Sequence, residues 1–134
     1  MKTFDIEITK IIKLAEEDLS DILCSCFEGG CNYWCCIDNT TDEWINAKEK
    51  LYVNGNPWPT TDEIMLYMLT HDMPIKLIDE EDDVVLYMTM NTFMGGIKMA
   101  IENGHWSGDY IDDVDGEVGD AIIQYAVFGE LVYG

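Results

Sequence analysis

The last eighteen residues, 117–134, constrain the fold of this chain more than any other stretch. Apolar residues recur at helical spacing over 118–126, Gly129 offers a helix stop, and Leu131–Tyr133 has the pattern of a short buried strand. A chain that ends in so apolar a unit has to dock it, because a loose tail gains nothing from such residues. The stretch therefore predicts a terminal helix and strand that both pack into the core.

The charge balance is the second constraint. The 134 residues include 27 acids, seven lysines and no arginine, which gives a formal net charge of −20. With 48% hydrophobic residues, the chain has enough apolar surface for one folded domain, 1–134, and is not a disordered acidic tail. Phosphate binding depends on lysine and arginine clusters, so direct binding of nucleic acid is disfavoured. A basic protein surface is the favoured partner.

Location signals are few. The first residues alternate in polarity and do not form the apolar core of a signal peptide. No run of residues reaches the length of apolar chain that a membrane helix needs. Five cysteines, an odd number, favour free thiols over a disulfide framework. We therefore expect a cytoplasmic protein that has no membrane partner.

Periodicity and cap signals predict the remaining elements. Residues 3–9 alternate as a strand, with Phe4, Ile6 and Ile8 on one face. We expect helices over 18–27 and 42–50, a helix opened by a Thr60–Glu63 capping box, a hairpin of 75–78 with 84–90, and a helix from a Thr89 cap to a Gly104 stop.

Together these elements predict an α+β fold. Its small, mostly antiparallel sheet would contain the N-terminal strand, the central hairpin and the C-terminal strand, in an order that the sequence leaves open. About four helices would cover one face of the sheet, and both chain termini would lie close together.

Five cysteines lie within thirteen residues: Cys24, Cys26, Cys31, Cys35 and Cys36. Structural zinc sites use separated ligand pairs, commonly C-x-x-C, and this chain has no C-x-x-C. Buried reduced thiols are therefore favoured over a metal site. Residues 109–117 are rich in acids, but aligning them with an EF-hand places Ile111 and Ile122 at the first and twelfth ligand positions, which excludes that loop. No metal and no cofactor are predicted.

Signals for catalysis are weak. The chain has no G-x-S-x-G, no H-E-x-x-H and no phosphate loop. Cys35 with His71 or His105 would be a thiol–imidazole pair, but scattered residues of these types are more often structural. We predict no catalytic residues and a protein that is not an enzyme.

Aromatic residues offer one candidate ligand site. Tyr33, Trp34, Trp106 and Tyr110, with Trp58, are suited to stacking on a base or ring in a small-molecule pocket. Packing in the core or in loops is the alternative for each of them, and the sequence does not separate the two. A nucleotide therefore stays open as a ligand, and so does a homo-oligomer with the pocket at its interface.

The acids are the other candidate site. Residues 79–134 hold thirteen acids and one lysine, Lys98, whereas residues 1–78 hold fourteen acids and six lysines. A charge run is usually a solvated face, but so one-sided a field also steers a surface onto basic grooves. The expected contact residues are Asp79, Glu80, Glu81, Asp82, Asp83, Asp109, Asp112, Asp113 and Asp115.

Three segments carry a resemblance: EGGxNYWC over Glu28–Cys35, FxxGIxxAIExG over Phe93–Gly104 and AIIQYAxFGE over Ala121–Glu130, where x marks a position outside the motif. Together they resemble a family of small proteins carried by phages and prophages of Firmicutes and other gut bacteria. Residues 38–75 depart from the family pattern, and of the five cysteines only Cys35 lies in the familiar motif. The resemblance implies a phage or prophage protein acting in the host cytoplasm, and it implies no particular activity.

Small acidic phage proteins often disarm host defences, and by that analogy we expect a counter-defence role. The first hypothesis is an inhibitor that imitates the phosphate backbone and blocks a nucleic-acid-binding host effector, such as a CRISPR nuclease. The second is a non-catalytic sponge that sequesters a nucleotide immune signal in the aromatic pocket. The third is an accessory or structural protein of the phage.

Overall fold

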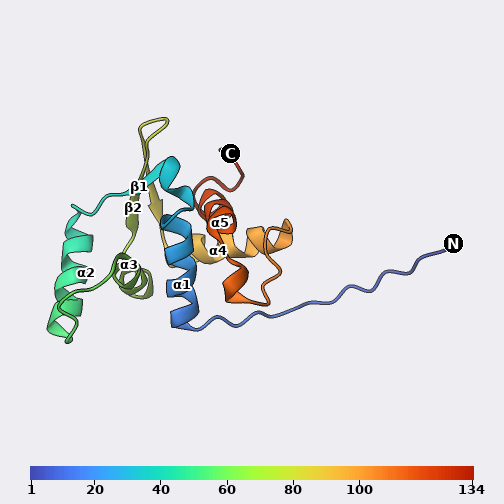
Figure 1. Cartoon of the computed structure of the whole chain (residues 1–134), viewed down its shortest axis with the longest axis horizontal. Coiled ribbons are helices and arrows are strands. Elements are labelled where there is room, and N and C mark those ends of the chain that lie inside the picture. The colour runs from blue at the N-terminus through green and yellow to red at the C-terminus, as the bar shows by residue number, and fades with distance from the viewer.

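The computed structural model describes all residues, 1–134, and consists of five α-helices and one small sheet (Figure 1). The α-helices are α1 (Glu16–Phe27), α2 (Asp42–Val53), α3 (Thr61–Thr70), α4 (Met90–Glu102) and α5 (Gly116–Phe128). The strands are β1 (Cys35–Ile37), β2 (Ile75–Asp79) and β3 (Val84–Met88), and the short 3-10 helices are η1 (Cys31–Tyr33) and η2 (Ile111–Asp113). The predicted α+β class is confirmed; the five α-helices match the individually predicted helical segments, whereas about four helices were expected in the fold as a whole.

The sheet is antiparallel throughout and has the order β1-β2-β3. Asp79 pairs with Val84 at the end of the β2–β3 hairpin, which confirms the central hairpin predicted from the sequence. Cys36 pairs with Ile78 where β1 joins the hairpin. The sheet therefore takes its third strand from the cysteine-rich segment and not from either terminus.

The two predicted terminal strands are wrong. Residues 3–9 form neither helix nor strand, and this segment runs away from the body of the protein (Figure 1). Leu131–Tyr133 does dock, as expected, but it does not pair with a strand. Instead, the backbone N–H groups of Val132 and Tyr133 donate to the Gln124 side chain at 2.7 and 2.8 Å. The two termini therefore do not meet in the sheet, contrary to the prediction from the sequence.

Side-chain caps explain where the predicted helices begin. Thr60 and Glu63 form the expected capping box, in which the Thr60 N–H donates to Glu63 Oε1 at 3.0 Å. Thr89 caps α4 and Asp115 caps α5, each accepting a hydrogen bond from a backbone N–H of the first turn. Gly129 then ends α5 in the left-handed conformation, at φ 74°. These boundaries are local, which is why the sequence predicts them well.

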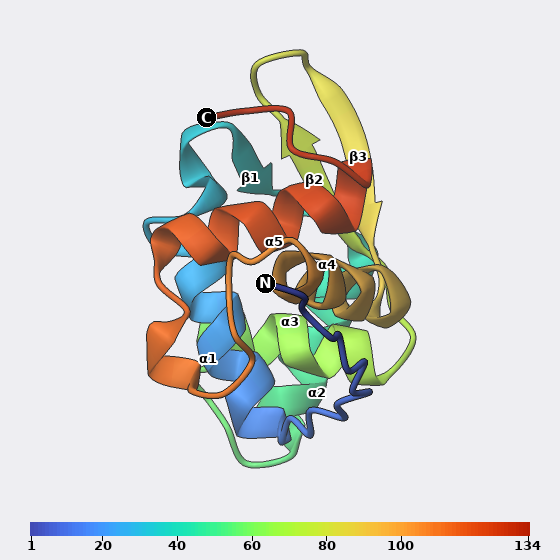
Figure 2. The same cartoon turned by 90° about the vertical axis from the view of Figure 1, so that its right-hand side faces the viewer.

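Helix α5 lies at the centre of the fold and crosses both α1 and α4 (Figure 2). It is buried on several sides, including at Val118, Ile122, Ile123 and Tyr125. A helix that is apolar on most of its surface has to be covered by several neighbours. None of the protein's helices has the length and apolar character needed to cross a bilayer.

Glycines allow the close approach of the three central helices. A Cβ on Gly96 of α4 would meet the backbone carbonyl of Ile122 and would lie 2.9 Å from the Ala126 Cβ. A Cβ on Gly119 of α5 would lie 2.7 Å from the Ser25 carbonyl oxygen of α1. Both positions are therefore fixed as glycine by backbone contact and not by a need for unusual dihedral angles.

The neighbouring glycines of α4 give a matched test of this packing. We expect Gly96→Ala to lower the free energy of unfolding by about 1–3 kcal/mol, because the added methyl group forces α4 and α5 apart. A Cβ on Gly95 would meet nothing within 4 Å. Gly95→Ala should therefore raise the stability by up to about 1 kcal/mol through helix propensity. Urea unfolding of both variants is the measurement, and equal effects would contradict the packing argument.

Candidate functional site

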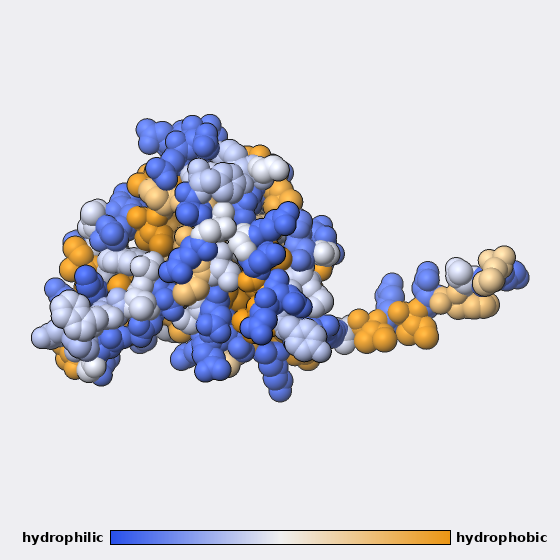
Figure 3. Space-filling view, viewed as in Figure 1, coloured by the Kyte–Doolittle hydropathy of each residue, from blue (hydrophilic) through white to orange (hydrophobic).

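The β2–β3 turn places four consecutive acids, Glu80–Asp83, at one end of the molecule. All four are exposed, and the turn projects beyond the rest of the fold (Figure 1). The same end is strongly hydrophilic in the space-filling view (Figure 3). Asp83 adopts a left-handed conformation at φ 55°, which aspartate tolerates better than most residues do. The hairpin thus carries a compact group of negative charges.

Asp79, which we expected on the binding surface, is instead buried and only 1% exposed. Its Oδ1 atom accepts hydrogen bonds from the Glu81 N–H at 3.0 Å and the Asp82 N–H at 3.4 Å. Its Oδ2 atom accepts a hydrogen bond from the Tyr133 hydroxyl at 2.6 Å. Asp79 therefore shapes the turn and has no surface to offer a partner. The structure corrects its predicted role from contact residue to positioning residue.

The C-terminal segment connects the acidic turn to α5 through hydrogen bonds. Gln124 Oε1 accepts the backbone N–H groups of Val132 and Tyr133, and Gln124 Nε2 donates to the Tyr133 carbonyl at 3.2 Å. Tyr133 then reaches Asp79, and this hydrogen bond to a carboxylate raises the pKa of Tyr133. The sequence reasoning missed Gln124 and Tyr133, because only an apolar pattern marked this segment.

No lysine compensates the charge of the turn. The whole chain has two ion pairs, Lys10 with Asp109 and Lys76 with Asp38. Lys76 lies on β2, where its Nζ is 3.1 Å from Asp38 Oδ2. Hydrogen bonds from Thr40, together with this lysine, lower the pKa of Asp38 to about 2. Because neither ion pair involves Glu80–Asp83, the negative charges of the turn are not neutralised by a lysine.

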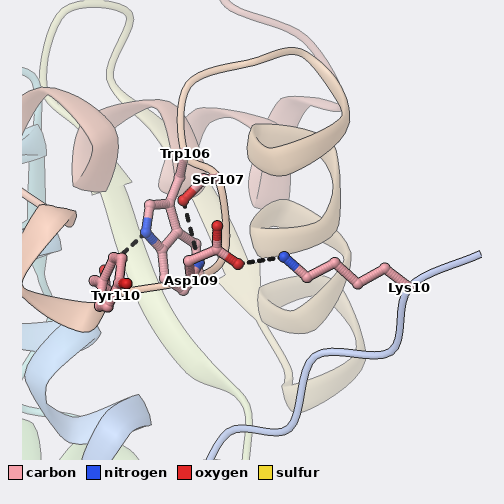
Figure 4. A network of polar contacts seen from close by, with 5 residues as sticks. All are labelled: Lys10, Trp106, Ser107, Asp109 and Tyr110. Carbon is pink, nitrogen blue, oxygen red and sulfur yellow. Dashed lines mark hydrogen bonds and ion pairs between the residues drawn. The ribbon is translucent and has the colours of Figure 1, made fainter.

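The other predicted contact residues, which lie within residues 109–115, are on the connection between α4 and α5. Asp109 pairs with Lys10 from the N-terminal segment, and its backbone N–H donates to Ser107 Oγ at 3.2 Å (Figure 4). The hydrogen bond and the charge of Lys10 lower the pKa of Asp109. Asp115 is occupied as the cap of α5. These contacts give Asp109 and Asp115 structural roles.

Asp112 and Asp113 remain as exposed acids on η2, without an ion pair. The segment that carries them lies well away from the β2–β3 turn in both views of the ribbon (Figures 1 and 2). The nine predicted contact residues therefore do not form one continuous patch. Glu80–Asp83 is the densest exposed group among them.

The four aromatic residues do not come together as a pocket. Trp34 is 0% exposed, and its ring packs against Phe128 and Tyr133 with centroids 5.3 and 5.2 Å apart. Its Nε1–H donates to Asp120 at 2.7 Å, and the Tyr33 hydroxyl donates to the same carboxylate at 2.6 Å. These residues form part of the core and its border.

Trp106 and Tyr110 form a separate cluster. Trp106 is 4% exposed, and its Nε1–H donates to the Tyr110 carbonyl at 3.0 Å (Figure 4). The Tyr110 side chain is exposed. None of the protein's five cavities is lined by any of the four aromatic residues. Two cavities have similar volumes: one of about 470 Å³ beside α2, lined in part by Trp44, Lys48 and Tyr52, and one of about 460 Å³ beside α4, lined in part by Ile12 and Ile97.

The cysteines are free thiols, and Cys26, Cys31 and Cys35 are buried. Burial, with repulsion from Asp62 and other acids, raises the pKa of Cys24 to about 11, and burial also raises the pKa of Cys26. Such thiols are protonated and poorly nucleophilic at neutral pH. No group of three or more His, Cys, Asp or Glu side chains is arranged to hold a metal ion.

The thiol–imidazole pair considered for Cys35 is not formed. Both histidines are exposed, and each has a different aromatic neighbour. The ring of His71 stacks on Tyr67 with centroids 3.8 Å apart, and His105 Nε2 lies 3.0 Å from the Tyr125 hydroxyl. Neither histidine is therefore placed to activate the buried Cys35.

Comparisons with protein-family models, with curated proteins and with solved structures find no match. The resemblance to phage and prophage proteins therefore stays a prediction from the three sequence segments.

The link between the C-terminal segment and the acidic turn is testable with Tyr133→Phe. Loss of the hydroxyl leaves a buried oxygen of Asp79 without its partner, so we expect the folding equilibrium constant to fall about tenfold. The hydrogen bond needs the protonated hydroxyl of Tyr133. In the folded state the pKa of Tyr133 is raised above the usual value of 10. The stability difference from the wild type should therefore be constant below about pH 10 and should shrink above it.

Tyr110→Phe is the matched control, because the exposed hydroxyl of Tyr110 has no hydrogen-bond partner in the protein. Urea unfolding between neutral pH and pH 11 measures both variants. Equal stability of Tyr133→Phe and Tyr110→Phe at neutral pH would contradict the proposed link between the C-terminal segment and the acidic turn.

Proposed function

We propose that this chain is a non-enzymatic inhibitor that binds the basic groove of a nucleic-acid-binding protein through the β2–β3 turn. In the phage or prophage setting that the sequence resembles, the partner is a defence effector in the cytoplasm of the bacterial host, such as a CRISPR nuclease. The inhibitor occupies the groove in place of the phosphate backbone. It therefore needs no cofactor and no chemical step.

The observation that carries this proposal is the presentation of Glu80–Asp83. Four exposed carboxylates lie on one tight turn, and none of them has an ion-pair partner. Asp79 accepts a hydrogen bond from the backbone of the turn, and the Tyr133 hydroxyl donates a hydrogen bond to Asp79. A preorganised group of charges loses less conformational entropy on binding than a mobile acidic tail does.

The charge of the whole chain supports the same role. A net charge of −20 attracts a basic groove over a long range and speeds association, and the surface acids repel free nucleic acid. Because this attraction is screened by salt, affinity for the partner should fall steeply as the ionic strength rises.

The nucleotide-sponge hypothesis has less support, because its four aromatic residues are divided between two clusters and line no cavity. A role as a phage accessory protein has no structural feature of its own in its favour. Pull-down from host lysate separates the three hypotheses, since they predict a basic host protein, no protein partner, and phage structural proteins respectively.

Charge neutralisation of the turn tests the proposal. The full chain serves as bait in a nuclease-treated lysate of a Firmicutes host, and the recovered partner is then measured by titration. The variant with Glu80→Gln, Glu81→Gln, Asp82→Asn and Asp83→Asn should bind that partner at least about 30-fold more weakly, because several charge pairs are lost. Added nucleic acid should compete with the wild-type chain for the same partner.

A control variant with Glu49→Gln, Glu102→Gln, Asp112→Asn and Asp113→Asn removes the same charge from exposed acids outside the turn that make no ion pair. It should keep the affinity of the wild type within about threefold, because the net charge falls equally in both variants but the charge pairs made by the turn are kept in this one. Equal loss in the two variants, or binding that is insensitive to salt, would rule out the turn as the docking element.

A further inference from the structure

The N-terminal segment has the pattern of a strand and no partner within its own chain. Phe4, Ile6 and Ile8 alternate with polar residues, and all three side chains are 83–87% exposed. None of the backbone–backbone hydrogen bonds of the protein involves residues 1–14. The apolar residues are visible along the projecting segment (Figure 3). A stripe of this kind gains stability only when it is covered.

The base of this segment is fixed to the body. Lys10 pairs with Asp109, and Ile12 contacts Gly108 (Figure 4 shows the ion pair). Ile12 and Leu14 are half-buried beside α4, whereas residues 1–9 are exposed. Residues 10–14 are therefore anchored to the body of the protein. Residues 1–9 extend away from it and are free to contact another molecule.

Strand β3 offers the matching edge. It is the last strand of the sheet, and in an antiparallel pair every second residue directs its N–H and C=O away from the partner strand. No other backbone group pairs with β3 on that side, and it lies at the rim of the fold (Figure 2). Its Val85 and Tyr87 are 48% and 57% exposed. Natural proteins usually protect such an edge. The other edge strand, β1, has three residues and offers less to pair with.

The two surfaces also differ in charge. Residues 1–15 hold three of the seven lysines and only two acids, Asp5 and Glu7, so this segment is slightly basic on a strongly acidic protein. Lys2 and Lys10 flank the alternating residues 3–9, and the acidic turn Glu80–Asp83 adjoins β3. Because Lys10 is already paired with Asp109, the favoured orientation is the parallel one, which brings the unpaired Lys2 to the Val84 end of β3, close to the turn. Electrostatic attraction therefore favours a second copy of this acidic chain over a basic protein as the partner of residues 3–9.

We propose that residues 3–9 of one copy add as a strand to β3 of a second copy, with reciprocal exchange closing a two-fold dimer. Phe4, Ile6 and Ile8 then continue the outer-face row formed by Ile78, Val85 and Tyr87, as cross-strand aromatic and β-branched pairs do. The inference does not depend on the proposed inhibitor function.

The test is the mass of the full chain in solution over a range of concentrations, together with amide hydrogen exchange. The wild type should be a dimer in which residues 3–9 and alternate amides of β3 are protected from exchange. The variant with Phe4→Ser, Ile6→Ser and Ile8→Ser changes only exposed side chains, so the body should stay folded. We expect its dimer dissociation constant to rise at least about 100-fold, and the protection to be lost, because the apolar pairing is gone from both tails.

A matched control removes three exposed apolar side chains of α2 through Ile45→Ser, Tyr52→Ser and Val53→Ser. This variant should keep the dimer and the protection, since α2 has no part in the exchange. A chain that is monomeric up to millimolar concentration would overturn the proposal. It would also be overturned by a dimer that survives the tail substitutions, or by protection of residues 3–9 without protection of β3.

Discussion

The packing of α5 against α1 and α4 is the constraint on which the rest of this structure depends. Contact between the helices is close enough that Gly96 and Gly119 admit no side chain. Close contact maximises dispersion and the burial of apolar surface, which a small domain needs when its own charge opposes compaction. With 27 acids and seven lysines, this chain folds against its own repulsion. The apolar centre is what holds such a charged surface together.

One polar path connects that centre to the acidic turn. Gln124 on α5 binds the backbone of the C-terminal segment, Tyr133 binds Asp79, and Asp79 binds the backbone of the turn. Each link buries a polar group together with its partner, as an interior requires. No buried side-chain nitrogen or oxygen in the protein lacks a hydrogen bond. The charges at the end of the hairpin are therefore held by the core of the protein.

Two surfaces remain without a partner, and they are chemically distinct. The turn Glu80–Asp83 presents charge without apolar area, which suits rapid, salt-dependent docking on a basic groove. Residues 3–9 and β3 present apolar area and free backbone groups, which suit strand addition. A dimer formed by pairing residues 3–9 with β3 would carry two copies of the turn Glu80–Asp83. Under the proposed function, this dimer would present two acidic turns to one effector or bridge two effectors.

The sequence by itself determined the elements whose signals are local. Caps at Thr60 and Thr89, the stop at Gly129 and the periodicity between them predict the helices and the hairpin, whereas the cap of α5 at Asp115 was not predicted. These signals act within a few residues, so they need no knowledge of the rest of the chain.

Only the tertiary structure decided which segments join the sheet and which acids face solvent. Alternation over residues 3–9 shows that one face can be covered, but a strand also needs an edge, and this segment finds none in its own chain. Asp79 shares the buried face of β2 with Ile75 and Leu77, but the sequence does not show which group satisfies its carboxylate there: the partner is the hydroxyl of Tyr133, 54 residues away. Pairing and burial depend on partners brought together by folding, and no local pattern in the sequence specifies them.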